Sequence, residues 1–121
     1  MKTNVISPKM HGLNDYVLAA ILLSVPRMLN LDKESQQLYR GVALNLLGYN
    51  AFTDHPLAIK RMISIADHYK MDMASLSGLA LGILSKHIRK DKKSLVFHLG
   101  ILTLSTFNVL LTDWNTKSVV D

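Results

Sequence analysis

The chain has 121 residues, of which 49% are apolar and 19% charged, below the roughly one quarter charged residues of an average domain. It has no cysteine, which excludes disulfides and thiolate metal sites. Its net charge is +5, and five of its fourteen Lys and Arg residues lie in the segment 86–93. That segment holds no aromatic residue on which a base could stack, so we expect no nucleic-acid partner.

Apolar segments alternate with polar connections, and no strand-like alternation competes with them. Ser7 and Pro8 are typical of a helix start, since serine caps free backbone N–H groups and proline suits the first helical position. The first apolar segment runs from Tyr16 to about Leu31, and the second from about Gln36 to Phe52.

The second half of the chain repeats this arrangement. After a short amphipathic stretch, 56–65, a third segment runs from Ser64 or Asp67 to Ser85 or Ile88. The basic loop 86–93 follows, and a fourth segment covers 94–114. The sequence therefore predicts an all-α fold of four helices in two pairs, forming a four-helix bundle.

A short pattern at the start of the first helix recurs 57 positions later. The corresponding residues are Ile6 and Ile63, Ser7 and Ser64, His11 and His68, and Asp15 and Asp72. Near the helix ends, Gly41, Thr53 and Asp54 correspond to Gly100, Thr112 and Asp113 at an offset of 59. We therefore predict one domain, 1–121, built from two tandem internal repeats, 6–54 and 63–113.

Charged residues are absent from long stretches of all four segments, namely 16–26, 41–53, 73–85 and 95–112. A helix in a soluble bundle usually carries a charged face, and a membrane span needs about 20 mainly apolar residues. We therefore expect four transmembrane helices in a multi-pass protein of the cell membrane. The positive-inside rule then places the basic loops in the cytoplasm and both termini outside.

Small residues share one face of the third segment. Ala74, Gly78 and Gly82 are spaced four apart, and the last two form a G-x-x-x-G motif that permits close helix approach. We expect this face to pack helices together. The expected partners are the lipid bilayer and either other membrane subunits or further copies of this chain.

The duplicated His-x-x-x-Asp elements are the candidate functional residues. His11 and Asp15 lie four residues apart on one helix face, as do His68 and Asp72, and we expect Asp54 and Asp113 at the same end of the molecule. One interpretation is structural, with this polar boundary cluster bracing the helix starts. The others are a metal site, since two His and two Asp suit Zn or Mn, and proton handling by tuned histidines.

Several of these motifs together resemble the SPW-repeat family of small bacterial membrane proteins. They are Ser7-Pro8, His11-Gly12, Asp15-Tyr16 and the segment 53–57, Thr-Asp-His-Pro-Leu. The tryptophan of the family signature has no counterpart, because the site at 24–27 is Ser-Val-Pro-Arg. The resemblance implies a four-helix fold in the bacterial inner membrane and no established activity.

From these features we expect a small integral membrane protein with a structural or accessory-subunit role and no evident enzymatic activity. The alternative is a metal- or proton-binding membrane protein that uses the paired His-x-x-x-Asp elements. We expect no cofactor under the first interpretation and a divalent metal under the second.

Overall fold

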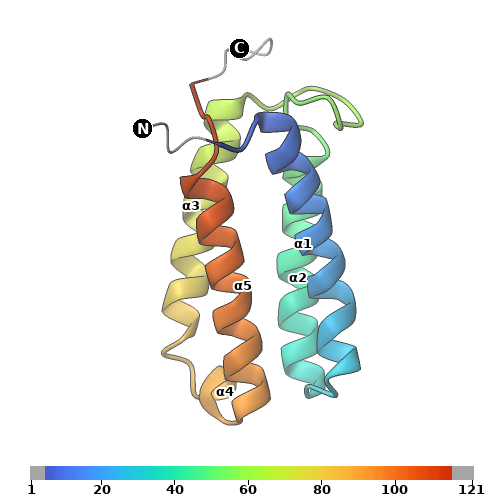
Figure 1. Cartoon of the computed structure of the whole chain (residues 1–121). Helices are drawn as coiled ribbons and strands as arrows, with labels where there is room; N and C mark the ends of the chain where they lie inside the picture. Colours follow the sequence, from blue (N-terminus) through green and yellow to red (C-terminus); the bar gives the residue numbers. More distant parts are fainter. Residues whose placement is uncertain (1–4, 116–121) are drawn as a thin grey trace.

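The computed structural model describes residues 5–115, and this part of the chain is all-α. It contains α1 (Pro8–Met28), α2 (Lys33–Asn50), α3 (Ile65–Gly82), the short α4 (Lys86–Arg89) and α5 (Lys92–Leu110). Figure 1 shows α1 beside α2 and α3 beside α5, with the connection after α2 at the same end as the start of α1 and the end of α5. The basic segment, expected as a loop, instead forms α4 and the start of α5.

Side chains at the helix starts explain where the long helices begin. Ser7 accepts a hydrogen bond from Met10 N at 3.2 Å, and Ser64 accepts one from Asp67 N at 3.1 Å. Asp32 and Asp91 cap α2 and α5 in the same way. Each cap satisfies a backbone N–H that has no partner within its helix, which fixes the first turn.

Two isolated β-bridges hold the helix starts against the helix ends. Ile6 pairs with Thr112, and Ile63 pairs with Thr53. The backbone bonds match between the two bridges, since Ile6 N donates to Leu111 O at 2.9 Å and Ile63 N donates to Phe52 O at 2.7 Å. The start of α1 is therefore tied to the end of α5, and the start of α3 to the end of α2.

The apolar core fills the space between the helices. Most of it comes from α1 and α2, and α3 and α5 add Leu79, Phe97 and Ile101. Toward the α4 end, the buried His98 links three helices, because its Nε2–H donates to Leu79 O at 2.6 Å and its Nδ1 accepts from Tyr39 Oη at 2.8 Å. This core holds α1 and α3 at a fixed separation, on which the candidate site depends.

The prediction of four transmembrane helices is wrong. Among the described helices only α5 is long and apolar enough to cross a membrane, with a mean hydropathy of 1.3 over its most apolar window. Each of α1, α2 and α3 includes three Asp, Glu, Lys or Arg residues, because these helices extend beyond the charge-free stretches of the sequence. One such helix is weak evidence for a membrane, since core helices also meet the criterion.

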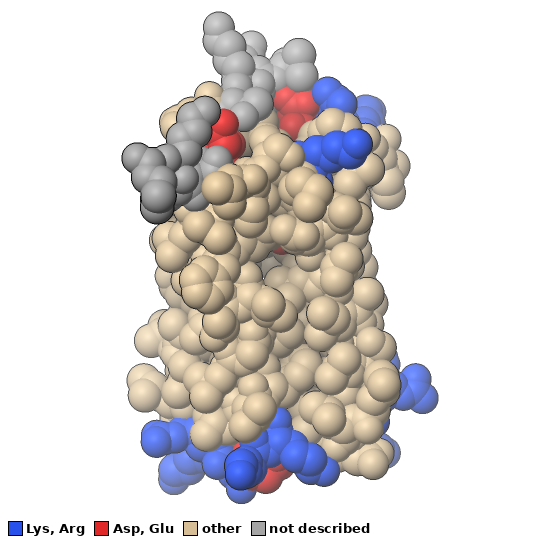
Figure 2. All heavy atoms as spheres, viewed as in Figure 1, with Lys and Arg blue, Asp and Glu red and all other residues tan. Residues whose placement is uncertain are grey.

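The predicted location in the membrane is therefore also wrong. A multi-pass protein of the cell membrane, with cytoplasmic basic loops and external termini, requires spans that α1, α2 and α3 do not provide. The bacterial inner-membrane assignment is not supported either. Figure 2 shows that the charged side chains of the visible face lie at both ends of the molecule, with a large group of Lys and Arg at the end that holds α4, and that uncharged side chains cover the middle.

Candidate functional site

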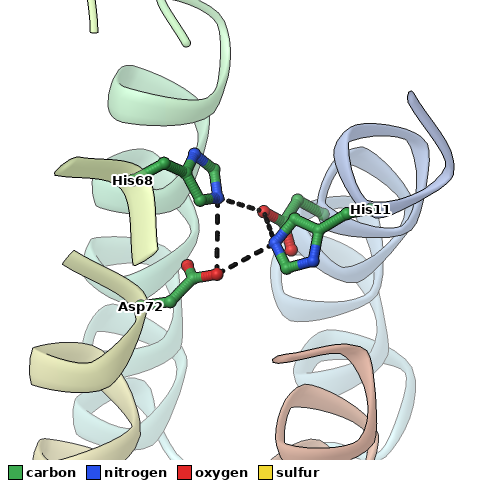
Figure 3. Close-up of side chains that lie close together, drawn as sticks. His11, His68 and Asp72 are labelled. Carbon is green, nitrogen blue, oxygen red and sulfur yellow. Dashed lines mark hydrogen bonds and ion pairs between the residues drawn. The ribbon is translucent and has the colours of Figure 1, made fainter. Parts of the chain in front are cut away.

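The two His-x-x-x-Asp elements face each other between α1 and α3. Figure 3 shows His68 and Asp72 projecting from α3 toward His11 on α1. Asp15 lies one turn after His11 on the same helix, and all four side chains are buried, each at most 5% exposed. The spacing of four residues puts each His and Asp on one helix face, and these faces of α1 and α3 meet across the interior of the bundle.

The four side chains form a closed ring in which nitrogen and oxygen atoms alternate. His11 Nε2 lies 2.9 Å from Asp72 Oδ2 and 3.2 Å from Asp15 Oδ2. His68 Nε2 lies 3.0 Å from Asp15 Oδ2 and 3.4 Å from Asp72 Oδ2. Each histidine is therefore closer to the carboxylate of the other helix than to the one on its own helix.

Two threonines orient the histidine rings. Thr112 Oγ1 lies 2.7 Å from His11 Nδ1, and Thr53 Oγ1 lies 2.7 Å from His68 Nδ1. Each threonine hydroxyl donates its hydrogen to the carbonyl four residues earlier, on Asn108 and Tyr49. The threonine oxygen must then accept from the histidine, so Nδ1 carries a hydrogen and Nε2 is the atom turned toward the carboxylates.

The outer carboxylate oxygens also have partners. Asp72 Oδ1 accepts a hydrogen bond from Tyr49 Oη at 2.7 Å, and Asp15 Oδ1 accepts one from Asn108 Nδ2 at 3.0 Å. Asn108 is itself held by Asn14, whose Nδ2 donates to its Oδ1 at 2.9 Å. These contacts fix both carboxyl groups so that their Oδ2 atoms point into the ring.

Interactions within the ring favour the ionised forms of His11, His68 and Asp72. Burial lowers the pKa of His11, but hydrogen bonds to Asp15 and Asp72 outweigh it and raise the pKa from 6.5 to about 9. The pKa of His68 is also raised, for the same reasons. Burial raises the pKa of Asp72, yet the two histidines hold it well below its ordinary value. Within the ring, the two histidines and Asp72 therefore favour one another's charged forms.

Aromatic rings enclose the site on the side of the chain ends. The Trp114 ring centroid lies 4.8 Å from that of His11 and 6.0 Å from that of His68. Tyr49 packs edge-on against His68, with centroids 4.9 Å apart. These rings limit water access, which strengthens every electrostatic interaction inside the ring.

The group can hold a metal ion. One donor atom from each of the four residues lies within 4.8 Å of all the others, and all four residues are buried. Histidine nitrogens with carboxylate oxygens are a common ligand set for divalent metals. A divalent metal is therefore possible at this site.

The two remaining acids of the predicted boundary cluster lie outside the ring. Asp54 Oδ1 is 3.3 Å from Arg61 Nη1, and Asp113 Oδ1 accepts a hydrogen bond from Asn115 N at 3.1 Å. The threonines that precede them, Thr53 and Thr112, contact the histidines instead. The repeated Thr-Asp pair was thus a useful signal in the sequence, but it is the threonine of each pair that contacts a histidine.

The predicted packing residues on α3 behave differently from one another. A Cβ added to Gly82 would lie 3.2 Å from the ring of His98, so this glycine permits a close contact within the chain. A Cβ added to Gly78 would have no atom within 4 Å, and Ala74 is exposed. Packing of this face against another copy or subunit stays a prediction.

Sequence reasoning missed Tyr49 and Asn108. They occupy corresponding positions in the two halves, 59 residues apart, and both bond a ring carboxylate. Because one is a tyrosine and the other an asparagine, a search for identical residues passes over them.

No protein-family model, no curated protein and no solved structure matches this chain. The resemblance to the SPW-repeat family therefore stays an expectation from the motifs.

Proposed function

We propose that this protein binds one divalent first-row metal ion at His11, Asp15, His68 and Asp72. The observation that supports this most strongly is the ring of donor atoms. Its four nitrogen–oxygen separations are 2.9, 3.0, 3.2 and 3.4 Å. Neighbouring ligands of a tetrahedral zinc ion, at bond lengths near 2.05 Å, are about 3.3 Å apart. A small rotation of the side chains would bring the more widely separated donor atoms to the same distance.

The groups behind the ring support the same function. Metal-binding histidines generally donate their other ring N–H to an oxygen, which fixes the tautomer and the ring orientation. Thr53 and Thr112 supply that oxygen here, so both Nε2 atoms face the centre. Tyr49 and Asn108 perform the matching task for the carboxylates by occupying their outer oxygens.

Charge balance also favours a divalent ion. Without a metal, the raised pKa values of His11 and His68 favour protonated rings beside the carboxylates. With a divalent ion, the histidines bind as neutral ligands and the positive charge of the ion replaces that of the protons. Binding therefore releases protons and keeps positive charge beside the buried carboxylates, which avoids the cost of burying an unpaired charge.

The donor set narrows the choice of metal. Magnesium and calcium prefer six or more oxygen ligands and usually retain water, whereas imidazole suits zinc, iron, copper and nickel. A buried site with two nitrogen and two oxygen donors thus fits zinc or iron(II) better than the alkaline-earth ions. Manganese remains compatible through the carboxylates.

Metal analysis tests this function. The protein is dialysed against zinc at neutral pH, freed of unbound ion, and its metal content measured by mass spectrometry. We expect one zinc per chain in the wild type and in His87→Ala, which removes a histidine outside the ring. His11→Ala and His68→Ala should each lose the ion. Metal content that is low in the wild type, or unchanged in the two ring variants, would overturn the proposal.

A second candidate is a purely structural clamp, in line with the structural role expected from the sequence. Its support is that each member of the ring has a hydrogen-bonded partner without any ion. Such a clamp would join α1 to α3 and specify how the two helix pairs pack. Under this function, His11→Ala and His68→Ala lower the free energy of unfolding while metal content is negligible in all proteins.

A further inference from the structure

A cavity of about 30 Å³ lies in the bundle core and is lined by both carboxylates of the ring. Besides Asp15 and Asp72, its polar lining residues are Tyr49, Ser75 and Ser105, and aliphatic side chains of the four long helices form the rest. The cavity therefore opens directly onto two of the four proposed metal ligands.

The two halves of the chain differ at the positions that create this space. Leu18 and Leu46 line the cavity from α1 and α2 and are buried. The residues that correspond to them in the second half are Ser75 and Ser105, which line the cavity from α3 and α5. Where two leucines face two serines, the missing side-chain volume leaves a void that a symmetric pair of leucines would fill.

The size and the lining of the cavity indicate its occupant. One water needs roughly 10–15 Å³ of such space, so the cavity accommodates about two atoms of that size. Its exposed lining is mainly apolar, and the polar part includes two carboxylates that repel anions. A small uncharged molecule, of the dimensions of a diatomic gas, matches these conditions.

We propose that this cavity binds a small uncharged diatomic ligand on the metal ion held by the four-residue ring. The inference rests on the proposed metal function. Four protein ligands leave a first-row metal such as iron(II) able to accept a further ligand. Asp15 and Asp72 line the cavity and His11 and His68 do not, so the cavity lies on the carboxylate side of the ring. The ring and the cavity together then form a metal centre with an open position.

A groove between α2 and α3 gives the ligand a route to the cavity. The groove and the cavity share Val42, Ser75 and Leu79. Gly41 and Gly78 line the groove, and a Cβ added at either position would meet no atom within 4 Å. The ligand would therefore enter past Ser75, which lines both the groove and the cavity.

Nitric oxide is a suitable probe, since it is uncharged and gives a characteristic half-integer-spin EPR signal when it binds iron(II). The full chain is loaded with iron(II) without oxygen, its iron content measured, and nitric oxide added in steps. We expect a signal equivalent to the bound iron in the wild type. Ser105→Leu should retain iron and bind nitric oxide at least ten-fold more weakly, because leucine fills the cavity. Thr103→Leu, at an exposed position of the same helix, should behave as the wild type.

The outcomes separate the two proposals. Wild-type protein that retains no iron or other divalent metal overturns the metal function and this inference with it. Full iron content without a nitric oxide signal, or a Ser105→Leu signal equal to that of the wild type, overturns the cavity proposal alone. If Ser105→Leu does not fold, Ser105→Val fills less of the space, and it should still weaken nitric oxide binding. Unchanged affinity in that variant overturns the cavity proposal.

Discussion

At the scale of single residues, the site depends on which atom of each side chain points inward. A histidine can present either ring nitrogen, and a carboxylate either oxygen. Here Thr53 and Thr112 take both Nδ1 atoms, and Tyr49 and Asn108 take both outer carboxylate oxygens. Four groups outside the ring thus determine that two nitrogens and two oxygens converge, which pre-organises the site.

Removing one threonine hydroxyl tests this dependence. Thr112→Val keeps the side-chain shape but takes away the nearer acceptor for His11 Nδ1–H, at 2.7 Å, and leaves only the carbonyl of Asn108 at 3.3 Å. We expect zinc affinity to fall about 10- to 100-fold, the usual range for loss of such a supporting contact. Competition with a chelating dye measures the affinity. Thr106→Val, whose hydroxyl bonds only the carbonyl of Leu102, is the matched control and should bind as the wild type.

The histidines also predict how the stability of the metal-free protein depends on pH. The pKa of His11 is about 9 in the fold against 6.5 as its ordinary value, because Asp15 and Asp72 favour its proton. Protonated His11 therefore stabilises the fold fully below pH 6.5, and this contribution is lost as the pH rises through 9. In urea unfolding, the free energy of unfolding should therefore fall by on the order of 3 kcal/mol between these pH values.

Metal should remove this dependence. An ion bound to His11 and His68 replaces their protons, so stability at saturating zinc should not fall between pH 6.5 and 9. His11→Gln, measured without metal, should lose the share of the alkaline decline that comes from His11 and keep the share that comes from His68. A decline of equal size in this variant would mean that another group is responsible.

At the scale of the elements, tightly packed contacts join the helix starts to the helix ends. The ring of His55, just after α2, packs closely against Gly12 of α1. A Cβ added to Gly12 would lie only 2.7 Å from the nearest atom of that ring. Asn50 Nδ2 donates to Gly12 O at 2.9 Å, and His55 Nε2–H donates to Asn50 O at 2.8 Å. This contact places the first turn of α1, and with it His11.

A methyl group at Gly12 should therefore disturb both the fold and the site. We expect Gly12→Ala to lower the free energy of unfolding by about 1–3 kcal/mol, because the buried histidine ring has to move. The control is Gly41→Ala, where nothing lies within 4 Å of the added atom. In a helix interior that change should raise stability by roughly 0.5–1 kcal/mol. Chemical denaturation of both variants compares them directly.

At the scale of the whole molecule, the ring joins the two helix pairs. His11 and Asp15 belong to the α1–α2 pair, and His68 and Asp72 to the α3–α5 pair. The shortest bonds of the ring, at 2.9 and 3.0 Å, both cross between the pairs. An ion bound to all four residues would therefore hold the two pairs together, and the unfolded chain has no such site.

Zinc should accordingly stabilise the whole protein and not just the site. At a free zinc concentration 100 times the dissociation constant, mass action predicts about 2.7 kcal/mol of added stability. Thermal unfolding with zinc and then with excess chelator should show a higher midpoint in zinc that the chelator reverses. His68→Ala should show no shift in either direction, and His87→Ala should shift as the wild type does.

Much of the local structure was predictable, because local structure follows short-range patterns. Ser7 and Ser64 were expected at helix starts and do cap α1 and α3. The spacing of His11 and Asp15 was enough to place them on one face of a helix. The membrane prediction failed for a related reason, since charge-free stretches were taken as whole helices, and the helices extend into charged residues on either side.

By itself, then, the sequence determined the four long helices, the caps Ser7 and Ser64, and the two pairs of histidine and aspartate that each share one helix face. Only the tertiary structure decided that each histidine bonds more closely to the aspartate of the other helix, that threonines set the ring nitrogens, and that two serines leave a cavity beside them. The physical reason is the difference in sequence separation between the interacting residues. Helical periodicity acts over four residues, whereas the meeting of α1 and α3 depends on core packing and backbone bridges between residues up to 106 positions apart, from Ile6 to Thr112.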